Sequence, residues 1–152
     1  MAGYFFDTSA LAKFYHSEVG TPEVDEIMGT AGAEIRISRL TVVELTSVFA
    51  IKVRTQFISR QDARLLLRQF REDIVSRRVD VFGVGETEFA LAERLIEQYA
   101  FDMRLRALDA VQLAVALGLK RQGLIDRFVA ADKILCEVAA LEGFSVLNPE
   151  HP

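Results

Sequence analysis

The chain has 152 residues, of which 51% are hydrophobic and 26% charged, as in an ordinary globular protein. This length allows a hydrophobic core without disulfides, and the single cysteine, Cys136, excludes a disulfide within the chain. The net charge of −4 argues against a strongly basic nucleic-acid-binding protein.

The start of the chain lacks the basic and apolar segments of a signal peptide. No apolar run comes near the roughly 20 residues that span a bilayer. We therefore expect a cytoplasmic protein that does not associate with membranes. Because no repeat, low-complexity tract or flexible linker interrupts the sequence, we expect residues 1–152 to form one domain.

Short apolar runs alternate with helical patterns along the whole chain. The apolar runs predict strands at 4–6, 34–37, 79–84, 128–131 and 144–147. The patterns between them predict helices at 9–15, 22–28, 41–54, 59–74, 86–99, 108–119 and 133–141. Thr21 is the expected N-cap of the second helix, with Pro22 at its first position. Strands separated by helices predict a three-layer α/β/α sandwich around a mostly parallel sheet.

Two acidic residues directly follow predicted buried strands. Asp7 ends the first strand, and Asp132 ends the fourth. The carboxyl ends of parallel strands are where α/β proteins bind ligands. A simpler interpretation is that each aspartate is the N-cap of the helix that follows it. Both interpretations remain open from the sequence.

Two further acids lie within predicted helices. Thr41 and Glu44 have the spacing of a capping box, which by itself is the favoured role for Glu44. Asp109 is surrounded by apolar residues, where an unpaired carboxylate is costly. A structural ion pair with Arg104 or Arg106 is the alternative to a functional role for Asp109.

The four acids, if they meet, form one negatively charged cluster. Like charges at short range repel each other unless a cation lies between them. Two histidines and one cysteine, spread through the chain, argue against zinc. Ligands that are all oxygen suit Mg²⁺ or Mn²⁺. Such an ion can activate a water molecule and offset the charge that builds up on a phosphodiester.

Each of the four acids lies in a distinctive segment. The segments are YFFDTSALAKFY at 4–15, SRLTVVEL at 38–45, LRALDAVQLA at 105–114 and VAADKIL at 129–135, with Gly143, Asn148 and Pro149 downstream. Each segment alone is a weak signal. All four in this order resemble the motifs of PIN-domain nucleases, and of VapC-like toxins in particular, over residues 4 to 149.

The resemblance implies an Mg²⁺- or Mn²⁺-dependent RNA endonuclease that leaves 5′-phosphate and 3′-hydroxyl ends. It implies that Thr8 or Ser9 supports the ligands or contacts the substrate. It also implies a cognate antitoxin and a homodimer, for which the apolar faces of 41–57 are available. The metal ligands that it implies, some acting through water, are Asp7, Glu44, Asp109 and Asp132.

One feature departs from the family pattern. A threonine or serine often precedes the fourth acid, whereas Ala130 and Ala131 stand there in this chain. Because residues that hydrogen-bond to a metal ligand orient it, this departure weakens the expected support for Asp132.

A basic stretch stands out against the acidic remainder. Residues 52–78 carry eight basic and three acidic side chains, a net charge of +5, which leaves −9 for the rest. Four arginines in this stretch have the spacing of one helix face: Arg60, Arg64, Arg68 and Arg71. The face is either an ordinary solvated surface or a contact for RNA phosphates or for an acidic antitoxin.

Two other classes of protein compete with the nuclease. A PIN-fold module that binds RNA or protein without cutting is one, and the presence of all four acids argues against it. A phosphoacceptor signalling domain also uses clustered carboxylates and Mg²⁺. That class has paired acids after the first strand, whereas only Asp7 follows it here, and labelling with acetyl phosphate would separate the two.

Overall fold

The computed structural model describes residues 2–152, and its strands form one five-stranded, wholly parallel sheet. The strands are β1 (Gly3–Phe6), β2 (Glu34–Ser38), β3 (Val79–Phe82), β4 (Arg127–Val129) and β5 (Ser145–Leu147). The helices are α1 (Thr8–Tyr15), α2 (Thr21–Gly29), α3 (Arg39–Arg54), α4 (Arg60–Val75), α5 (Glu86–Tyr99), α6 (Ala107–Arg121) and α7 (Lys133–Leu141). The predicted three-layer α/β/α architecture is confirmed.

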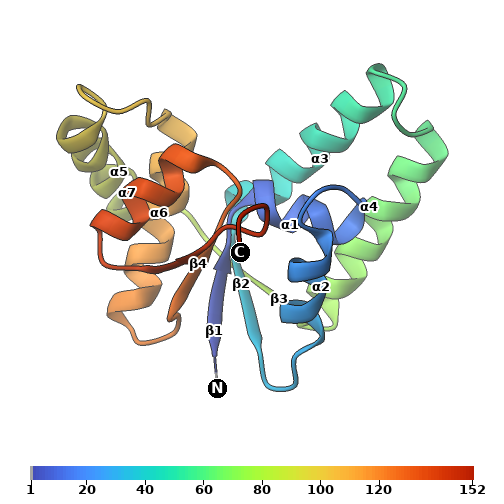
Figure 1. Cartoon of the computed structure of the whole chain (residues 1–152), viewed down its shortest axis with the longest axis horizontal. Helices are drawn as coiled ribbons and strands as arrows, with labels where there is room; N and C mark the ends of the chain where they lie inside the picture. Colours follow the sequence, from blue (N-terminus) through green and yellow to red (C-terminus); the bar gives the residue numbers. More distant parts are fainter. Residues whose placement is uncertain (1) are drawn as a thin grey trace.

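The strand order is β3-β2-β1-β4-β5. The chain runs outward from β1 through β2 to β3 and then returns to the other side of β1 at β4. Helix α1 follows β1 and α7 follows β4, and these helices lie on opposite faces of the sheet (Figure 1). The carboxyl ends of β1 and β4 therefore form the point where an α/β sheet offers a crevice for ligands.

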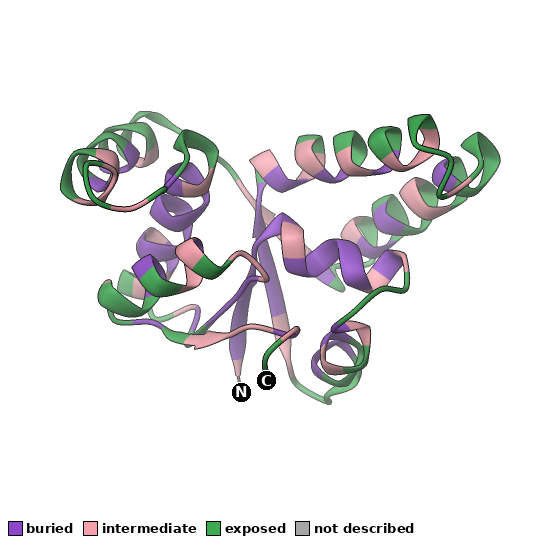
Figure 2. Cartoon of the chain, turned by 45° about the horizontal axis from the view of Figure 1, so that its top comes forward, coloured by how far each residue is buried: buried purple, intermediate pink, exposed green. Residues whose placement is uncertain are grey.

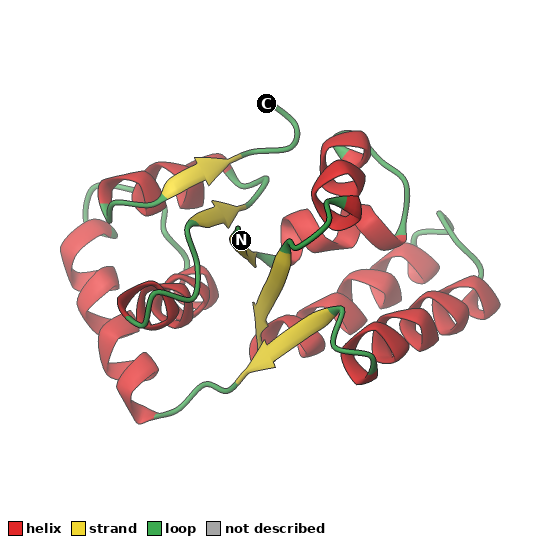
Figure 3. Ribbon diagram, turned by 90° about the horizontal axis from the view of Figure 1, so that it is seen from below, coloured by secondary structure: helices red, strands yellow, loops and turns green. Residues whose placement is uncertain are grey.

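Alternation along β1 divides the core into two layers. Phe5 packs into the cluster formed with α5, α6 and α7. Tyr4 and Phe6 point to the other face and pack into the cluster that includes α1 to α4. Figures 1 and 3 show these two groups of helices on either side of the strands. β1 is buried along its whole length, which explains its continuous apolar run.

Helices α3 and α4 extend beyond the sheet as an arm, and much of their outer surface is exposed (Figure 2). Val43 is 64% exposed and Phe57 76% exposed on this arm. Within residues 2–152, no helix is both long and apolar enough to cross a bilayer.

Most predicted boundaries lie within two residues of those observed, but two predicted caps are wrong. Gly20, with a φ of 92°, precedes α2 in place of Thr21. The Thr21 hydroxyl instead accepts a hydrogen bond from the Glu18 N–H at 3.0 Å. Helix α3 begins at Arg39, because Ser38 is its cap and accepts from the Thr41 N–H. The Thr41–Glu44 capping box therefore does not form.

Candidate active site

Asp7 follows β1 directly, and its side chain is buried. Its Oδ2 accepts hydrogen bonds from the Ser9 N–H at 3.2 Å and the Ser9 hydroxyl at 2.5 Å, so it is the N-cap of α1. Burial raises the pKa of Asp7 to about 6; the bonds from Ser9 oppose this shift, and the charges of Asp109 and Glu44 add to it. Asp7 therefore caps α1 and also interacts electrostatically with two other carboxylates, those of Asp109 and Glu44.

Glu44 joins a buried hydrogen-bond network that the sequence did not predict. The Gln112 side-chain amide donates to Glu44 Oε1 at 2.7 Å and to Thr41 Oγ1 at 2.7 Å. The Thr8 hydroxyl donates to the same Glu44 oxygen at 2.9 Å. The Ser38 hydroxyl donates to Gln112 Oε1 at 2.6 Å. This network connects α1, α3 and α6 and fixes the orientation of Glu44.

Asp109 and Asp132 share one cation, Arg106. The Arg106 Nε lies 3.2 Å from Asp109 Oδ2, and its Nη2 lies 3.4 Å from Asp132 Oδ2. The sequence left Arg104 and Arg106 open as partners, and Arg106 forms the pair. Asp132 is also the N-cap of α7, because its Oδ1 accepts from the Leu135 N–H at 2.9 Å. Burial raises the pKa of Asp109, against the opposing effect of Arg106.

All four predicted acids lie at the carboxyl end of the sheet. The charges of Asp109 and Glu44 act on Asp7, and the charge of Asp132 acts on Asp109. The four are not, however, arranged as ready ligands. Among residues 2–152, no three acidic, histidine or cysteine side chains lie in a group that could hold a metal ion as they stand.

Residues 4–141 match the family described as PIN domain. The chain belongs to the PIN-domain family. This confirms the family resemblance on nine-tenths of the chain. No curated protein matches the chain in sequence.

Three solved structures show the same fold over nearly the full length of this PIN domain. FitAcB from Neisseria gonorrhoeae has a TM-score of 0.66 at 18% identity and covers 98% of this chain and 99% of its own. A toxin–antitoxin complex from Klebsiella pneumoniae has a TM-score of 0.61 at 15% identity, with 96% and 97% covered. The sarcin-ricin loop cleaving toxin VapC20 from Mycobacterium tuberculosis has a TM-score of 0.65 at 17% identity, with 93% and 95% covered.

A cavity of about 440 Å³ opens beside the acids of this PIN domain. Its lining includes Ser9 and Asp132 at the carboxylate side and Lys13 and Lys52 farther along α1 and α3. The cavity is therefore lined by two lysines as well as by Asp132.

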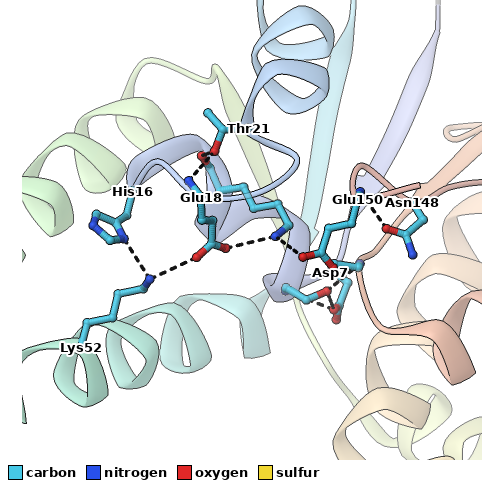
Figure 4. Close-up of polar contacts among 10 residues, drawn as sticks. Asp7, His16, Glu18, Thr21, Lys52, Asn148 and Glu150 are labelled. Atoms are coloured by element: carbon cyan, nitrogen blue, oxygen red, sulfur yellow. Dashed lines mark hydrogen bonds and ion pairs between the residues drawn. The ribbon is translucent and has the colours of Figure 1, made fainter. Parts of the chain in front are cut away.

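The lysines belong to an ion-pair network that the sequence did not predict (Figure 4). Lys13, only 5% exposed at its side chain, lies 3.2 Å from Glu18 and 3.3 Å from Glu150 of the C-terminal segment. Lys52 lies 3.2 Å from Glu18 and 2.9 Å from His16 Nδ1. Burial opposes ionisation of Glu18, but hydrogen bonds from both lysines lower its pKa overall. This network ties the C-terminal segment to α1.

The donor chemistry of the site fits a hard divalent cation. All four candidate ligands are carboxylates, and Asp7 is buried without a cation in direct contact among the described residues. The charge on Asp109 and Asp132 is instead offset by Arg106, whose side chain is 70% exposed. An ion would therefore compete with a solvent-facing guanidinium rather than with a buried one.

The predicted arginine stripe lies away from these acids. Arg60, Arg64, Arg68 and Arg71 are exposed along α4, in the arm shown in Figure 1. None of them forms an ion pair with the four acids in the described part of the chain. Their proposed contact with RNA or an antitoxin remains a prediction.

Proposed function

We propose that this PIN domain, expected to comprise residues 1–152, is an Mg²⁺- or Mn²⁺-dependent RNA endonuclease and the toxin of a toxin–antitoxin pair. The observation that carries the proposal is that four carboxylates, from the β1–α1 junction, α3, α6 and the β4–α7 turn, lie at the carboxyl end of the sheet. The names of the similar structures, which include a toxin and a toxin–antitoxin complex, support the toxin role.

Each side chain has a role in this proposal. Asp7 and Asp109 would hold the ion directly, and Glu44 and Asp132 would act directly or through water. When bound there, the ion would supply an activated water molecule and would offset negative charge on the phosphodiester. Gln112 keeps Glu44 in place.

Two hydroxyls support the acids. Ser9 donates to Asp7, favouring its charged form, and Thr8 donates to Glu44. Both would thus act on the ligands, although the cavity beside them also leaves room for contact with the substrate.

Two protein partners, an antitoxin and a second copy of this chain, would bind to the α3–α4 arm or to the acidic site. An acidic antitoxin segment would meet the arginines of α4, or an antitoxin arginine would take the place between Asp109 and Asp132 that Arg106 occupies. A homodimer would cover exposed apolar residues of α3 and its end, such as Val43, Ile51 and Phe57. We expect this pair to act in the cytoplasm.

A second candidate is a PIN-fold module that binds RNA or protein without cutting. The observation that favours it is the pairing of Asp109 and Asp132 with Arg106, which offsets the charge that would otherwise attract an ion. Metal-dependent cleavage separates the two functions.

The experiment is incubation of the purified protein with labelled total RNA and Mg²⁺ or Mn²⁺. The proposal predicts discrete cuts with 5′-phosphate ends, lost with EDTA and in Asp7→Asn and Asp109→Asn. Asp102→Asn, which removes an exposed carboxylate after α5, is the matched control and should cut normally. A folded, antitoxin-free protein that binds RNA but leaves it intact would favour the second candidate.

A further inference from the structure

Two arginines lie in the segment before α6. Leu105 is 6% exposed and belongs to the core cluster with α5, α6 and α7. Arg106 has an extended backbone, with a φ of −86° and a ψ of 157°. Arg104 and Arg106, on either side of the buried Leu105, are both exposed.

The two arginines line one cavity beside the acidic group. This cavity has a volume of about 320 Å³ and is lined by Arg104, Arg106, Asp132 and Ile134. Asp132 also lines the larger cavity that contains Thr8 and Ser9. The two hollows therefore adjoin each other at one of the four acids.

Within this hollow Arg106 is paired with carboxylates, whereas Arg104 is unpaired in the described part of the chain. Arg106 pairs with Asp109 and Asp132, but 70% of its side chain stays in contact with solvent. Arg104 is exposed and forms no ion pair or side-chain hydrogen bond with residues 2–152. The charged residues that line the hollow are thus the two arginines and Asp132, which is already paired with Arg106.

We propose that Arg104 and Arg106 bind a backbone phosphate of RNA, next to the phosphodiester that lies at the carboxylates. This inference rests on the proposed ribonuclease function and deepens it. Guanidinium groups bind phosphate through paired, charge-assisted hydrogen bonds. A phosphate in this hollow pairs with Arg106 in place of Asp109 and Asp132. Binding of the RNA strand therefore leaves both acids available to a cation.

The proposal makes the arginines beside α6, and not the stripe on α4, the main phosphate contact near the cut. Arg104 is the residue that tests it, because it touches none of the four acids in the described structure. Arg106 is less suitable for a test, since its removal also changes the charge around Asp109 and Asp132.

The first experiment measures binding of a fluorescein-labelled single-stranded RNA to the Asp7→Asn protein, with Mg²⁺ present. Adding Arg104→Gln should raise the Kd about five-fold at roughly 0.1 M salt and lower the slope of log K against log salt by about 0.7, the loss of one phosphate contact. Arg104→Lys should recover part of the affinity. Arg121→Gln, the same charge change at the exposed C-terminal end of α6, is the matched control and should leave the slope unchanged.

The second experiment locates the phosphate. Neutral methylphosphonates replace single phosphates on either side of the mapped cut, and cleavage is measured with wild type and Arg104→Gln. A methylphosphonate at one flanking position should slow cleavage by the wild-type protein. The same substitution should not slow cleavage by Arg104→Gln any further, because that variant already lacks the contact. If the wild-type protein cuts RNA and Arg104→Gln binds and cuts RNA equally well, the proposed phosphate site is wrong, whereas the proposed ribonuclease function is retained. If wild type neither cuts nor binds RNA, both proposals fail together.

Discussion

The Gln112 side-chain amide on α6 donates a hydrogen bond to Glu44 on α3 across 2.7 Å. Both its donor and its acceptor ends are engaged, since the Ser38 hydroxyl bonds to its oxygen. Gln112 is 1% exposed, so it cannot replace these partners with water. It therefore links the position of an acid in the site to the packing of the core.

Replacement of Gln112 by methionine should keep its volume and remove these bonds. We expect the free energy of unfolding to fall by about 1–3 kcal/mol, because buried polar partners are left unsatisfied. Affinity for Mn²⁺ should fall about ten-fold or more, since Glu44 loses its support. Urea unfolding and calorimetric titration measure the two effects. Gln98→Met, on the exposed face of α5, is the control, and an unchanged Mn²⁺ affinity in folded Gln112→Met would contradict the role assigned to Gln112.

Asp7 should make the metal-free protein less stable as the pH rises. Its pKa is about 6 in the folded chain against an ordinary value of 3.8, so the folded state holds the proton more tightly. The contribution of Asp7 to stability therefore falls as the pH rises from about 4 to about 6, and remains lost above that.

Asp7→Asn should consequently be more stable than wild type by about 2–3 kcal/mol near pH 7 in EDTA, and the difference should vanish near pH 4. Urea unfolding across this range measures it, with Asp102→Asn as the control for loss of an exposed charge. Equal dependence on pH in wild type and Asp7→Asn would show that Asp7 titrates normally.

The Ser9 hydroxyl should set the pH at which Asp7 becomes charged. It donates to Asp7 at 2.5 Å, which opposes the rise in pKa, and accepts from the Ala131 N–H at 3.0 Å. Ser9→Ala should therefore raise the pKa of Asp7 further and move the acid limb of the pH–activity profile to higher pH. Ser9→Thr, which keeps the hydroxyl, should restore the limb. A uniform loss of activity at all pH values would instead indicate a general structural defect.

Lys13 should stabilise the junction of α1 with the C-terminal segment. Its ammonium lies between Glu18 and Glu150 and is almost completely buried. Lys13→Met should lower the free energy of unfolding by about 1–3 kcal/mol, because two carboxylates lose their partner. Lys133→Met removes an exposed lysine and is the control in urea unfolding. Equal stability of the two variants would mean that the network contributes little.

Local patterns were sufficient for much of the fold. Periodicity predicted the limits of α5 and α7 to the residue and placed Asp7 and Asp132 after strands. Both are helix caps, which is one of the two interpretations that the sequence left open. The cap of α3 was missed because Ser38 and Thr41 are both good cap residues, and only packing decides between them. Thr21 was misplaced for a similar reason, since its hydroxyl bonds to the preceding loop.

The sequence by itself determined the order of strands and helices along the chain and the parallel α/β class, and it singled out the four candidate acids, because these depend on short-range periodicity and on motifs within a few residues. Tertiary structure alone decided which side chains meet. Gln112 is a polar residue in a largely apolar helix, and its partners lie 68 to 104 positions away. Lys13 and Glu150 are separated by 137 positions. Contacts at such separations follow from how whole elements pack, and no local pattern records them.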